Sequence, residues 1–524
     1  MAKVVAIDAG TTGVRALVVD EHARITDVAY RELTQHFPRP GWVEHDPNEI
    51  WDAVEATLAE VATRLSDSGD TDTVAAIGIT NQRETLVAFD RATGRPLHRA
   101  IVWQDRRTAP MCAALVEQGH LPMVRATTGL VLDPYFSATK AAWLLQHGNL
   151  ALGADDPHLS FCTVDTWVLW NLTGGAAYVT DPSNASRTLL LDTATRTWSP
   201  ELCDLFGVPL HTLPAVCPSA GRIAATALAD LGPAAARVLD GVPVSGILGD
   251  QQAALFGQAC FERGMVKVTY GTGSFVLANA GGERPPAPEG LVVSVAWDLG
   301  DHAAAPADPV AYALEGSAFV SGAAIQWMRD GLGIIDAASE VGPLAASVPD
   351  SGGVTFVPAL TGLGSPHWDP LARGIVTGLT RGAGRAQLAR ACIEAMAFQV
   401  RDMTDAMTAA SSSPLSALRA DGGAAVMDLL LELQAEQSRM PVARPRALES
   451  TALGAATIAG LAEGVWSTLD ELAALWEADM LFEPQLPMEL ADATYAVWQR
   501  AVEKARGWAD PEPATSGGAR ERRG

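Results

Sequence analysis

A cluster of polar residues near the amino terminus has the composition of a phosphate-binding loop. Between two apolar runs, residues 4–7 and 16–19, lie a carboxylate, two glycines, two threonines and a cation: Asp8, Gly10, Gly13, Thr11, Thr12 and Arg15. Glycines let successive N–H groups converge on an anion, and a carboxylate beside them suits Mg²⁺ held through water. Many β-hairpins carry glycine and threonine for backbone reasons alone, so both interpretations stay open for this motif.

A second stretch repeats this pattern. Residues 266–279 again place a Gly-Thr-Gly tip, with Thr272 at its centre, between two apolar runs. Two such hairpins in one chain indicate two similar domains, each offering a loop to one nucleotide bound between them. The repeat therefore favours the phosphate interpretation.

Asp250 is the residue best placed to act as a base. It follows an apolar run and begins a Gly-Asp-Gln-Gln sequence of the kind that opens a helix. One interpretation is a helix N-cap, and another is a carboxylate that accepts the proton of an attacking alcohol. Both can hold, because a carboxylate at a helix N-terminus stays ionised and phosphoryl transfer depends mainly on positioning and charge neutralisation.

Arg83 and Glu84 directly follow an apolar run that is typical of a buried strand. They could form a solvated ion pair, or they could clamp a polyol, because arginine donates to hydroxyl groups and glutamate accepts from them. Three aromatic residues, Trp103, Tyr135 and Phe275, are equally open to two interpretations. They are either core and rim residues or the apolar wall that a small polyol needs on one side.

The elements that must position these residues alternate between strands and helices. Strands are expected over 74–79, 86–90 and 243–248, and helices from Asp46 onward and over 164–170, 322–329, 387–403 and 451–462. This alternation in both halves predicts an α/β fold with a mixed sheet in each domain and a ligand cleft between them.

The domain organisation follows from the same pattern. We expect a polyol-binding domain over residues 1–255 and a nucleotide-binding domain over 256–507, with an exposed loop at 281–290. The remaining residues, 508–524, are rich in proline, glycine and charge, which predicts a disordered tail.

Composition excludes several classes of partner. The chain has 524 residues, 48% of them apolar, which predicts at least two soluble globular domains. Its net charge of −24 argues against nucleic acid and anionic membrane surfaces, but not against a nucleotide held by neutral backbone donors. Scattered cysteines, and no evident signal peptide or membrane span, predict a cytoplasmic protein with reduced thiols.

Longer motifs identify a family. The sequence resembles the FGGY family of carbohydrate kinases, and within it the glycerol kinases, from about residue 3 to about residue 507. The resemblance is carried by residues 41–51 (GWVEHDPNEIW), 75–85 (AAIGITNQRET), 129–140 (GLVLDPYFSATK), 249–258 (GDQQAALFGQ), 270–275 (YGTGSF) and 361–374 (TGLGSPHWDPLARG).

This resemblance implies an actin-like fold in which two ribonuclease H-like domains close around a small polyol and MgATP. The implied activity is ATP-dependent phosphorylation of glycerol to sn-glycerol 3-phosphate, with Mg²⁺ accompanying ATP. Members of the family are often dimers or tetramers, so a homo-oligomer is expected. The resemblance to members acting on other small polyols or sugars leaves their substrates as alternatives.

The resemblance also assigns residues. Those matching the glycerol contacts are Arg83, Glu84, Tyr135, Asp250 and Gln251, with Trp103 and Phe275 as the apolar wall. Asp250 matches the catalytic base and is a possible metal ligand, and Asp8 matches the carboxylate near Mg²⁺. Those expected to line the nucleotide are Thr11, Thr12, Gly13, Arg15, Thr272, Gly322, Gln326, Gly423 and Met427.

The sequence departs from the family pattern at three places. Ala9 replaces a usual glutamine in the first loop, and Met427 and Asp428 replace a usual asparagine pair. Met427 is therefore expected to contact the base through apolar atoms. A Gly-Gly-Thr-Arg loop that some members use to bind fructose 1,6-bisphosphate is absent near residues 230–241, so we expect no regulation by that sugar.

Two alternatives belong to other functional classes. An actin-like ATPase would share the phosphate loops but has no need of a polyol clamp at Arg83 and Glu84. A catalytically degenerate regulator is suggested by Ala9 and Met427, although Asp8 and Asp250 are both retained.

Overall fold

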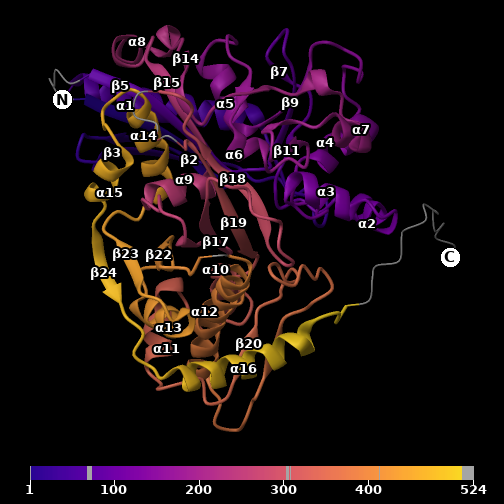
Figure 1. The fold of residues 1–524 in the computed structure, drawn as a ribbon, viewed down its shortest axis with the longest axis vertical. Helices are drawn as coiled ribbons and strands as arrows, with labels where there is room; N and C mark the ends of the chain where they lie inside the picture. The colour runs from indigo at the N-terminus through magenta and orange to yellow at the C-terminus, as the bar shows by residue number, and fades with distance from the viewer. Residues whose placement is uncertain (1, 68–72, 303–305, 307, 412, 510–524) are drawn as a thin grey trace.

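The computed structural model describes residues 2–67, 73–302, 306, 308–411 and 413–509. The chain forms an N-terminal and a C-terminal lobe, each built around a mixed β-sheet (Figure 1). The predicted disordered tail over 508–524 lies outside the described residues from residue 510 onward.

The N-terminal sheet confirms the first predicted hairpin. Its strand order is β14 (Ala220–Ala225), β15 (Pro243–Gly249), β5 (Thr73–Asn81), β1 (Ala2–Ala9), β2 (Gly13–Val19) and β3 (Ile25–Glu32). Strands β1, β2 and β3 are antiparallel neighbours, whereas β1, β5 and β15 run parallel. Since parallel strands end at one edge, the segments after β1, β5 and β15 lie together there.

The C-terminal sheet repeats this arrangement. Its order is β18 (Val292–Asp298), β19 (Val310–Ala318), β17 (Ser274–Gly281), β16 (Met265–Tyr270), β22 (Ala417–Asp421), β23 (Val442–Pro445) and β24 (Ala478–Phe482). Strands β16, β17 and β19 form the antiparallel part, and β16, β22 and β23 the parallel part. The internal repeat predicted from the two Gly-Thr hairpins is therefore present in the sheet topology.

Helices form three layers around the two sheets. The outer layer of the N-terminal lobe contains α1 (Pro47–Asp67), α5 (Val164–Leu172) and α8 (Pro233–Val238). The outer layer of the C-terminal lobe contains α10 (Gly322–Asp330), α11 (Val341–Ala346), α12 (Arg385–Ala410) and α13 (Asp428–Ser438). Between the sheets lie α9 (Asp250–Gly257) and α14 (Ser450–Ala462), which share one apolar core with residues of both (Figure 1).

Close packing in the middle layer explains why small side chains predominate over residues 451–462. A Cβ atom added to Gly78 on β5 would lie 1.9 Å from the carbonyl oxygen of Ala455, and one added to Gly454 would lie 1.8 Å from that of Ala253. Helix α14 therefore approaches both β5 and α9 at distances that only glycine permits. The proposed domain boundary near residue 255 falls within α9, inside this shared layer.

A smaller sheet projects from the N-terminal lobe. It contains β4 (Glu44–His45), β8 (Ala100–Ile101), β6 (Leu86–Asp90), β7 (Arg95–Pro96) and β9 (Leu159–Thr163), and packs with α2 (Ala109–Glu117), α3 (Leu121–Thr128), α4 (Ala138–His147) and α7 (Pro200–Phe206). The described short elements are α6 (Pro182–Ala185), β10 (Val179–Thr180), β11 (Leu191–Asp192), β12 (Thr197–Trp198), β13 (Ala215–Val216), β20 (Thr355–Val357) and β21 (Ile375–Thr377).

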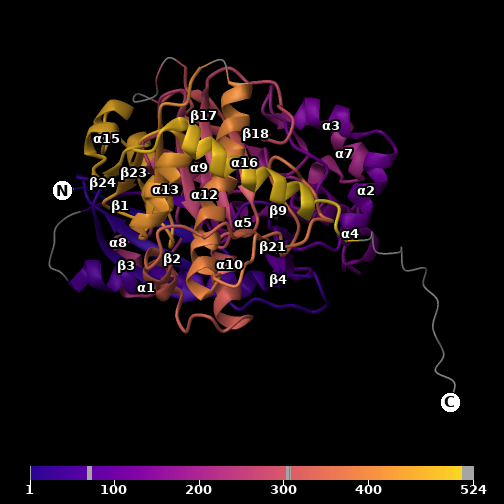
Figure 2. The same cartoon turned by 90° about the horizontal axis from the view of Figure 1, so that it is seen from below.

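The carboxyl-terminal helices brace the C-terminal lobe. Helix α15 (Leu469–Leu475) lies beside the middle layer, and α16 (Met488–Ala505) crosses α12 (Figure 2). Phe398 of α12 stacks on Trp498 of α16 with ring centroids 5.5 Å apart. Among the described helices, none is both long and apolar enough to cross a membrane.

The prediction of an exposed loop over residues 281–290 is wrong in part. Most of this segment is half-buried, because Arg284 reaches across to the N-terminal lobe. Its guanidinium donates to the Thr193 hydroxyl and to the carbonyl of Ala126, each at 2.7 Å. The loop is thus a contact between the lobes.

Candidate functional site

The first glycine-threonine loop joins β1 to β2. The Gly10 N–H donates to the carbonyl of Gly13 at 3.0 Å, which closes the turn. A Cβ atom at Gly13 would lie 2.4 Å from the Tyr30 ring, so only glycine fits there. Thr12 is exposed and Thr11 is half-exposed, so the loop is open to solvent.

Asp8 lies at the base of this loop, opposite Arg15 in the hairpin register, with Nη1 3.5 Å from the carboxylate. Burial raises the pKa of Asp8 to about 7 against the effect of Arg15, and the negative charges of Asp250 and Glu449 add to the rise. Asp8 and Asp250 therefore repel one another when both are ionised, which is the electrostatic setting that a divalent cation relieves.

The second loop follows β16 and is tied to the start of α10. The N–H of Gly322 donates to the carbonyl of Gly271 at 3.0 Å, and the N–H of Ala323 to that of Thr272 at 3.0 Å. A Cβ atom at Gly273 would lie 2.3 Å from the Ala318 carbonyl oxygen. The loop thus presents Thr272 beside a helix N-terminus, an arrangement that suits phosphate.

A pocket of about 690 Å³ opens beside the second loop. Of the residues predicted to line the nucleotide, it brings together Thr272, Gly322, Gln326, Gly423 and Met427. The other wall comes from α11 and its approach, and includes Gly342, Pro343 and Ala346. Met427 packs near Gly342, where an added Cβ would lie 3.5 Å from the methionine sulfur.

A much smaller cavity, of about 30 Å³, holds all the residues predicted to contact the polyol. Its lining is Arg83, Glu84, Trp103, Tyr135, Asp250, Gln251 and Phe275. Most of them follow β5, β8 and β15 of the N-terminal lobe, Tyr135 lies in the loop before α4, and Phe275 lies in β17 of the C-terminal lobe, so both lobes contribute to one cavity.

Arg83 is the centre of this cavity's charge network. Its guanidinium forms two hydrogen bonds with Glu315 of β19, at 2.7 and 2.9 Å, and its Nε lies 3.1 Å from the Asp250 carboxylate. The Nε–H group is buried and has no aligned hydrogen-bond acceptor in the described part of the chain. A ligand hydroxyl could supply that acceptor.

Glu84 is held by a second arginine. Arg187, which follows α6, donates through Nε to the Glu84 carboxylate at 2.6 Å and through Nη2 to Glu315 at 3.1 Å. Glu84 also has a backbone φ of 62°, a left-handed conformation that is uncommon for a residue other than glycine. Although burial acts to raise it, the guanidinium groups of Arg187 and Arg83 lower the pKa of Glu315 to about 2.

Asp250 is the first residue of α9, and the N-cap is Gly249, so the N-cap interpretation of Asp250 is wrong. The Asp250 carboxylate instead accepts from the backbone N–H of Gln251 at 2.7 Å and remains 28% exposed. Burial raises its pKa above the ordinary value, against the opposing charges of Arg83 and Lys267. A carboxylate with a raised pKa is a better proton acceptor than an ordinary aspartate.

The aromatic wall connects the two predicted sites. Trp103 packs edge-on against Tyr135 and Phe275, with centroid separations of 5.6 and 6.0 Å. Its indole N–H donates to the Thr11 hydroxyl at 2.9 Å. The first Gly-Thr loop therefore contacts the wall of the cavity that contains the residues predicted for the polyol, and Phe275 lies three residues after Thr272 of the second loop.

Three further charged residues contact the predicted site residues and were not predicted from the sequence: Arg187, Glu315 and Lys267. All three are fully buried and bond to predicted site residues. A signal was present for two of them, because a charged residue inside an apolar strand, as in YALEG and VKVTY, rarely stays buried without a partner.

Within the described ranges, no group of three or more His, Cys, Asp or Glu residues could hold a metal by protein ligands alone. Asp8 and Asp250 nevertheless fit Mg²⁺, which takes one or two carboxylates and completes its coordination with water and nucleotide phosphates.

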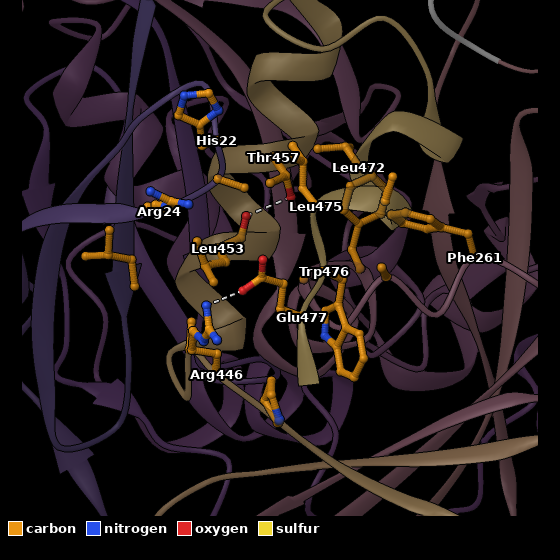
Figure 3. A pocket seen from close by; sticks show the side chains of 18 residues that line it. His22, Arg24, Phe261, Arg446, Leu453, Thr457, Leu472, Leu475, Trp476 and Glu477 are labelled. Carbon is orange, nitrogen blue, oxygen red and sulfur yellow. Dashed lines mark hydrogen bonds and ion pairs between the residues drawn. The ribbon is translucent and has the colours of Figure 1, made fainter. Parts of the chain in front are cut away.

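A further pocket, of about 370 Å³, lies between the turn after β2 and the region of α15. Figure 3 shows His22, Arg24, Phe261 and Trp476 around it, with an ion pair between Arg446 and Glu477. It contains none of the residues predicted for the polyol or the nucleotide.

The chain is similar to known proteins over most of its length. The N-terminal domain model of the FGGY family of carbohydrate kinases matches residues 3–257, and the C-terminal domain model matches residues 266–463. A glycerol kinase of Bordetella parapertussis is 50% identical over 509 residues, covering 97% of this chain and 98% of that protein. A glycerol kinase of Gloeobacter violaceus is 50% identical over 505 residues, covering 96% and 97%.

A solved structure is also similar. The crystal structure of Plasmodium falciparum glycerol kinase with ADP aligns with a TM-score of 0.88 at 32% identity, covering 96% of this chain and 98% of that one. This likeness, together with the repeated sheet, confirms the predicted α/β fold of two actin-like lobes.

Proposed function

Since the chain belongs to the FGGY family of carbohydrate kinases, we propose that it transfers the terminal phosphate of ATP to glycerol, forming sn-glycerol 3-phosphate. Relatives named glycerol kinase, about half identical over nearly their whole length, support this substrate.

The polyol cavity carries the proposal. It offers an unmatched Arg83 N–H donor and the acceptors Glu84 and Asp250 on one side, with aromatic rings on the other. Glycerol has hydroxyl groups along one edge and C–H groups along the other, so it matches both sides.

Asp250 is the proposed base. In the complex, its carboxylate accepts the proton of the attacking glycerol hydroxyl as that oxygen bonds to the terminal phosphorus. The bond between the terminal phosphorus and the bridging oxygen then breaks, and ADP leaves. Arg83 and the Gln251 amide fix the direction of the hydroxyl, which reduces the orientational part of the barrier.

The two loops are proposed to hold the phosphates. Thr11, Thr12, Gly13 and Arg15 approach from the N-terminal lobe, and Thr272 approaches from the C-terminal lobe. Mg²⁺, bound to the phosphates and reached by Asp8 and Asp250, would neutralise charge that develops on the phosphate oxygens. Closing the lobes over this site would exclude water and favour glycerol as the acceptor.

The base of ATP is proposed to lie in the 690 Å³ pocket, between Met427 and the α11 wall. Gly423, Gly322 and Gln326 line the passage from the base toward the second loop. Because Met427 offers no hydrogen bond comparable to an asparagine amide, recognition of the base here depends on apolar contact.

The test is an ADP-release assay across polyols, with ATP and GTP each tried as donor. We expect glycerol to give the highest kcat/KM. A higher value for erythritol, dihydroxyacetone or xylulose would reject glycerol as the substrate, and ADP release that is indifferent to added glycerol would favour an actin-like ATPase.

Three expectations stay predictions: a homo-oligomer, a cytoplasmic location, and insensitivity to fructose 1,6-bisphosphate. All six cysteines are free, and five of them are buried, which agrees with reduced thiols. Sedimentation of the purified protein and assays with the sugar added would test the first and third.

A further inference from the structure

Lys267 is a fully buried lysine with no role in the proposed chemistry. It lies in β16, five residues before Thr272 of the second phosphate loop. Its ammonium group donates to the side-chain oxygen of Gln251 and, at 3.0 Å, to the hydroxyl of Thr269. Burial lowers the pKa of Lys267 to about 8, against the opposing charges of Asp421 and Asp250, so the group is mostly protonated at neutral pH.

This contact determines which way the Gln251 amide faces. A lysine ammonium only donates hydrogen bonds, so the amide oxygen must face Lys267. The amide nitrogen is then left for the polyol cavity, which Gln251 lines. Without the lysine, nothing described in the structure prevents the amide from rotating and presenting its oxygen instead.

Asp421 faces the same lysine from the neighbouring strand. It ends β22 and pairs with Thr269 in the register of β16 and β22. Burial raises the pKa of Asp421, and the positive charge of Lys267 opposes that rise. Asp421 also accepts a hydrogen bond from the side chain of Gln258 at 2.8 Å.

Lys267 and Asp421 therefore form hydrogen bonds with residues at opposite ends of α9. Gln251 lies in its first turn, and Gln258 directly follows its last residue. Trp476 covers the Gln258 end of α9. Its indole N–H donates to the Gln258 side chain at 3.1 Å, and the Arg419 guanidinium lies over its ring, 3.7 Å from the centroid. Figure 3 shows this tryptophan at the edge of the pocket. The strands that hold α9 lead directly into the second loop and into Gly422 and Gly423.

We propose that Lys267 is a positioning residue for phosphoryl transfer. It orients the Gln251 side chain, and it fixes the position of the first turn of α9, which carries Asp250, relative to the phosphate loops. The inference rests on the proposed function, because it concerns how that reaction's acceptor is aligned. Lys267 itself touches neither substrate.

The test compares Lys267→Met, Gln251→Ala and the double variant. Loss of a charge-assisted hydrogen bond predicts a fall of about 10- to 100-fold in kcat/KM for glycerol in Lys267→Met, with KM for ATP changed by less than about threefold. If Lys267 acts through Gln251, the double variant is no worse than Gln251→Ala alone.

Matched controls separate positioning from general destabilisation. Thr457→Val removes a buried hydroxyl that bonds only within α14, and its kinetic constants should stay within about twofold of wild type. Should Lys267→Met fail to fold, Lys267→Gln, which keeps an N–H donor, takes its place, and its kcat/KM for glycerol should lie between those of wild type and Gln251→Ala.

Two outcomes would overturn the inference while the wild type still phosphorylates glycerol. One is an equal rise in KM for glycerol and for ATP, and the other is additive losses in the double variant. A wild type that releases no ADP in response to glycerol would instead reject the proposed function, which is a separate result from the same assay.

Discussion

The proposed polyol cavity and the proposed nucleotide pocket offer a ligand opposite kinds of contact. The first is about 30 Å³, lies between the lobes and rests on buried charges, with Arg83 and Glu315 almost inaccessible to solvent. The second is about 690 Å³ and is lined largely by glycine, alanine, proline and methionine. One offers directed hydrogen bonds, and the other offers backbone donors and apolar surface.

The difference follows from the ligands that we propose. A small polyol presents only hydroxyl groups, so its site must hold donors and acceptors in fixed positions before it binds. Buried ion pairs achieve this because each charge is costly to leave unpaired. A nucleotide is large enough to bind through many weaker contacts, so we expect its pocket to tolerate a change such as Met427. Substitutions should therefore have large effects in the first region and small effects in the second.

The largest expected effect is on turnover in the polyol cavity. Asp250→Asn removes the proposed proton acceptor while keeping the side-chain size, so we expect kcat to fall about 10²- to 10⁴-fold. The dissociation constant of glycerol, measured by titration calorimetry, should change by less than about tenfold. Near-normal turnover would remove Asp250 as the base.

A large stability effect is expected beneath the same cavity. Glu315→Gln removes the charged acceptor that Arg83 and Arg187 share and leaves them buried with Glu84 and Asp250 as their remaining carboxylates, which should lower the free energy of unfolding by about 3–5 kcal/mol in urea. The matched control in the nucleotide pocket is Asp428→Asn, whose side chain is 55% exposed and pairs with Arg444. That change should cost less than about 1 kcal/mol, and equal losses would contradict the contrast between the regions.

The pH dependence of stability should also distinguish the two regions. Since the folded-state pKa of Asp8 is raised from 3.8 to about 7, its contribution to stability is complete below pH 3.8 and is lost as the pH rises to about 7. Asp8→Asn should escape this loss, so its stability relative to wild type should increase from pH 4 to 7 and then level off. Urea unfolding with EDTA and without nucleotide measures this.

The control for this experiment comes from the nucleotide pocket. Ser339→Ala changes a residue of that pocket without altering any titratable group, so its difference from wild type should not vary with pH. If Asp8→Asn behaves in the same way, the carboxyl group of Asp8 is not protonated in the folded protein near neutral pH.

The smallest effect is expected for binding of the nucleotide base. Met427→Ala removes an apolar contact of about 1 kcal/mol, which should raise KM for ATP by roughly three- to tenfold and leave KM for glycerol unchanged. Met427→Asn is the informative companion, because an amide that bonds the base should increase the preference for ATP over GTP. A parallel change in KM for glycerol would show that the two regions are coupled more tightly than we propose.

Much of the site could be predicted because its signals are local. The hairpin around Asp8 and the Gly-Thr-Gly turn each depend on residues that are neighbours in the chain, and β1–β2 and β16–β17 formed as predicted. The strand leading to Arg83 and the helix beginning at Asp250 could be predicted for the same reason. The family resemblance then assigned partners that spacing alone left open, and the cavity brings all seven polyol residues together.

The sequence by itself determined the two loops, the alternating elements and the types of side chain at the cleft, since each depends on short-range patterns of glycine, charge and apolar residues. Only the tertiary structure decided how those side chains are held. Arg83 meets Glu315 across 232 positions of sequence, Arg284 crosses between the lobes, and α14 packs into the middle layer. Such contacts arise when separate segments bury their surfaces together, and no local pattern specifies which distant charge will lie opposite another.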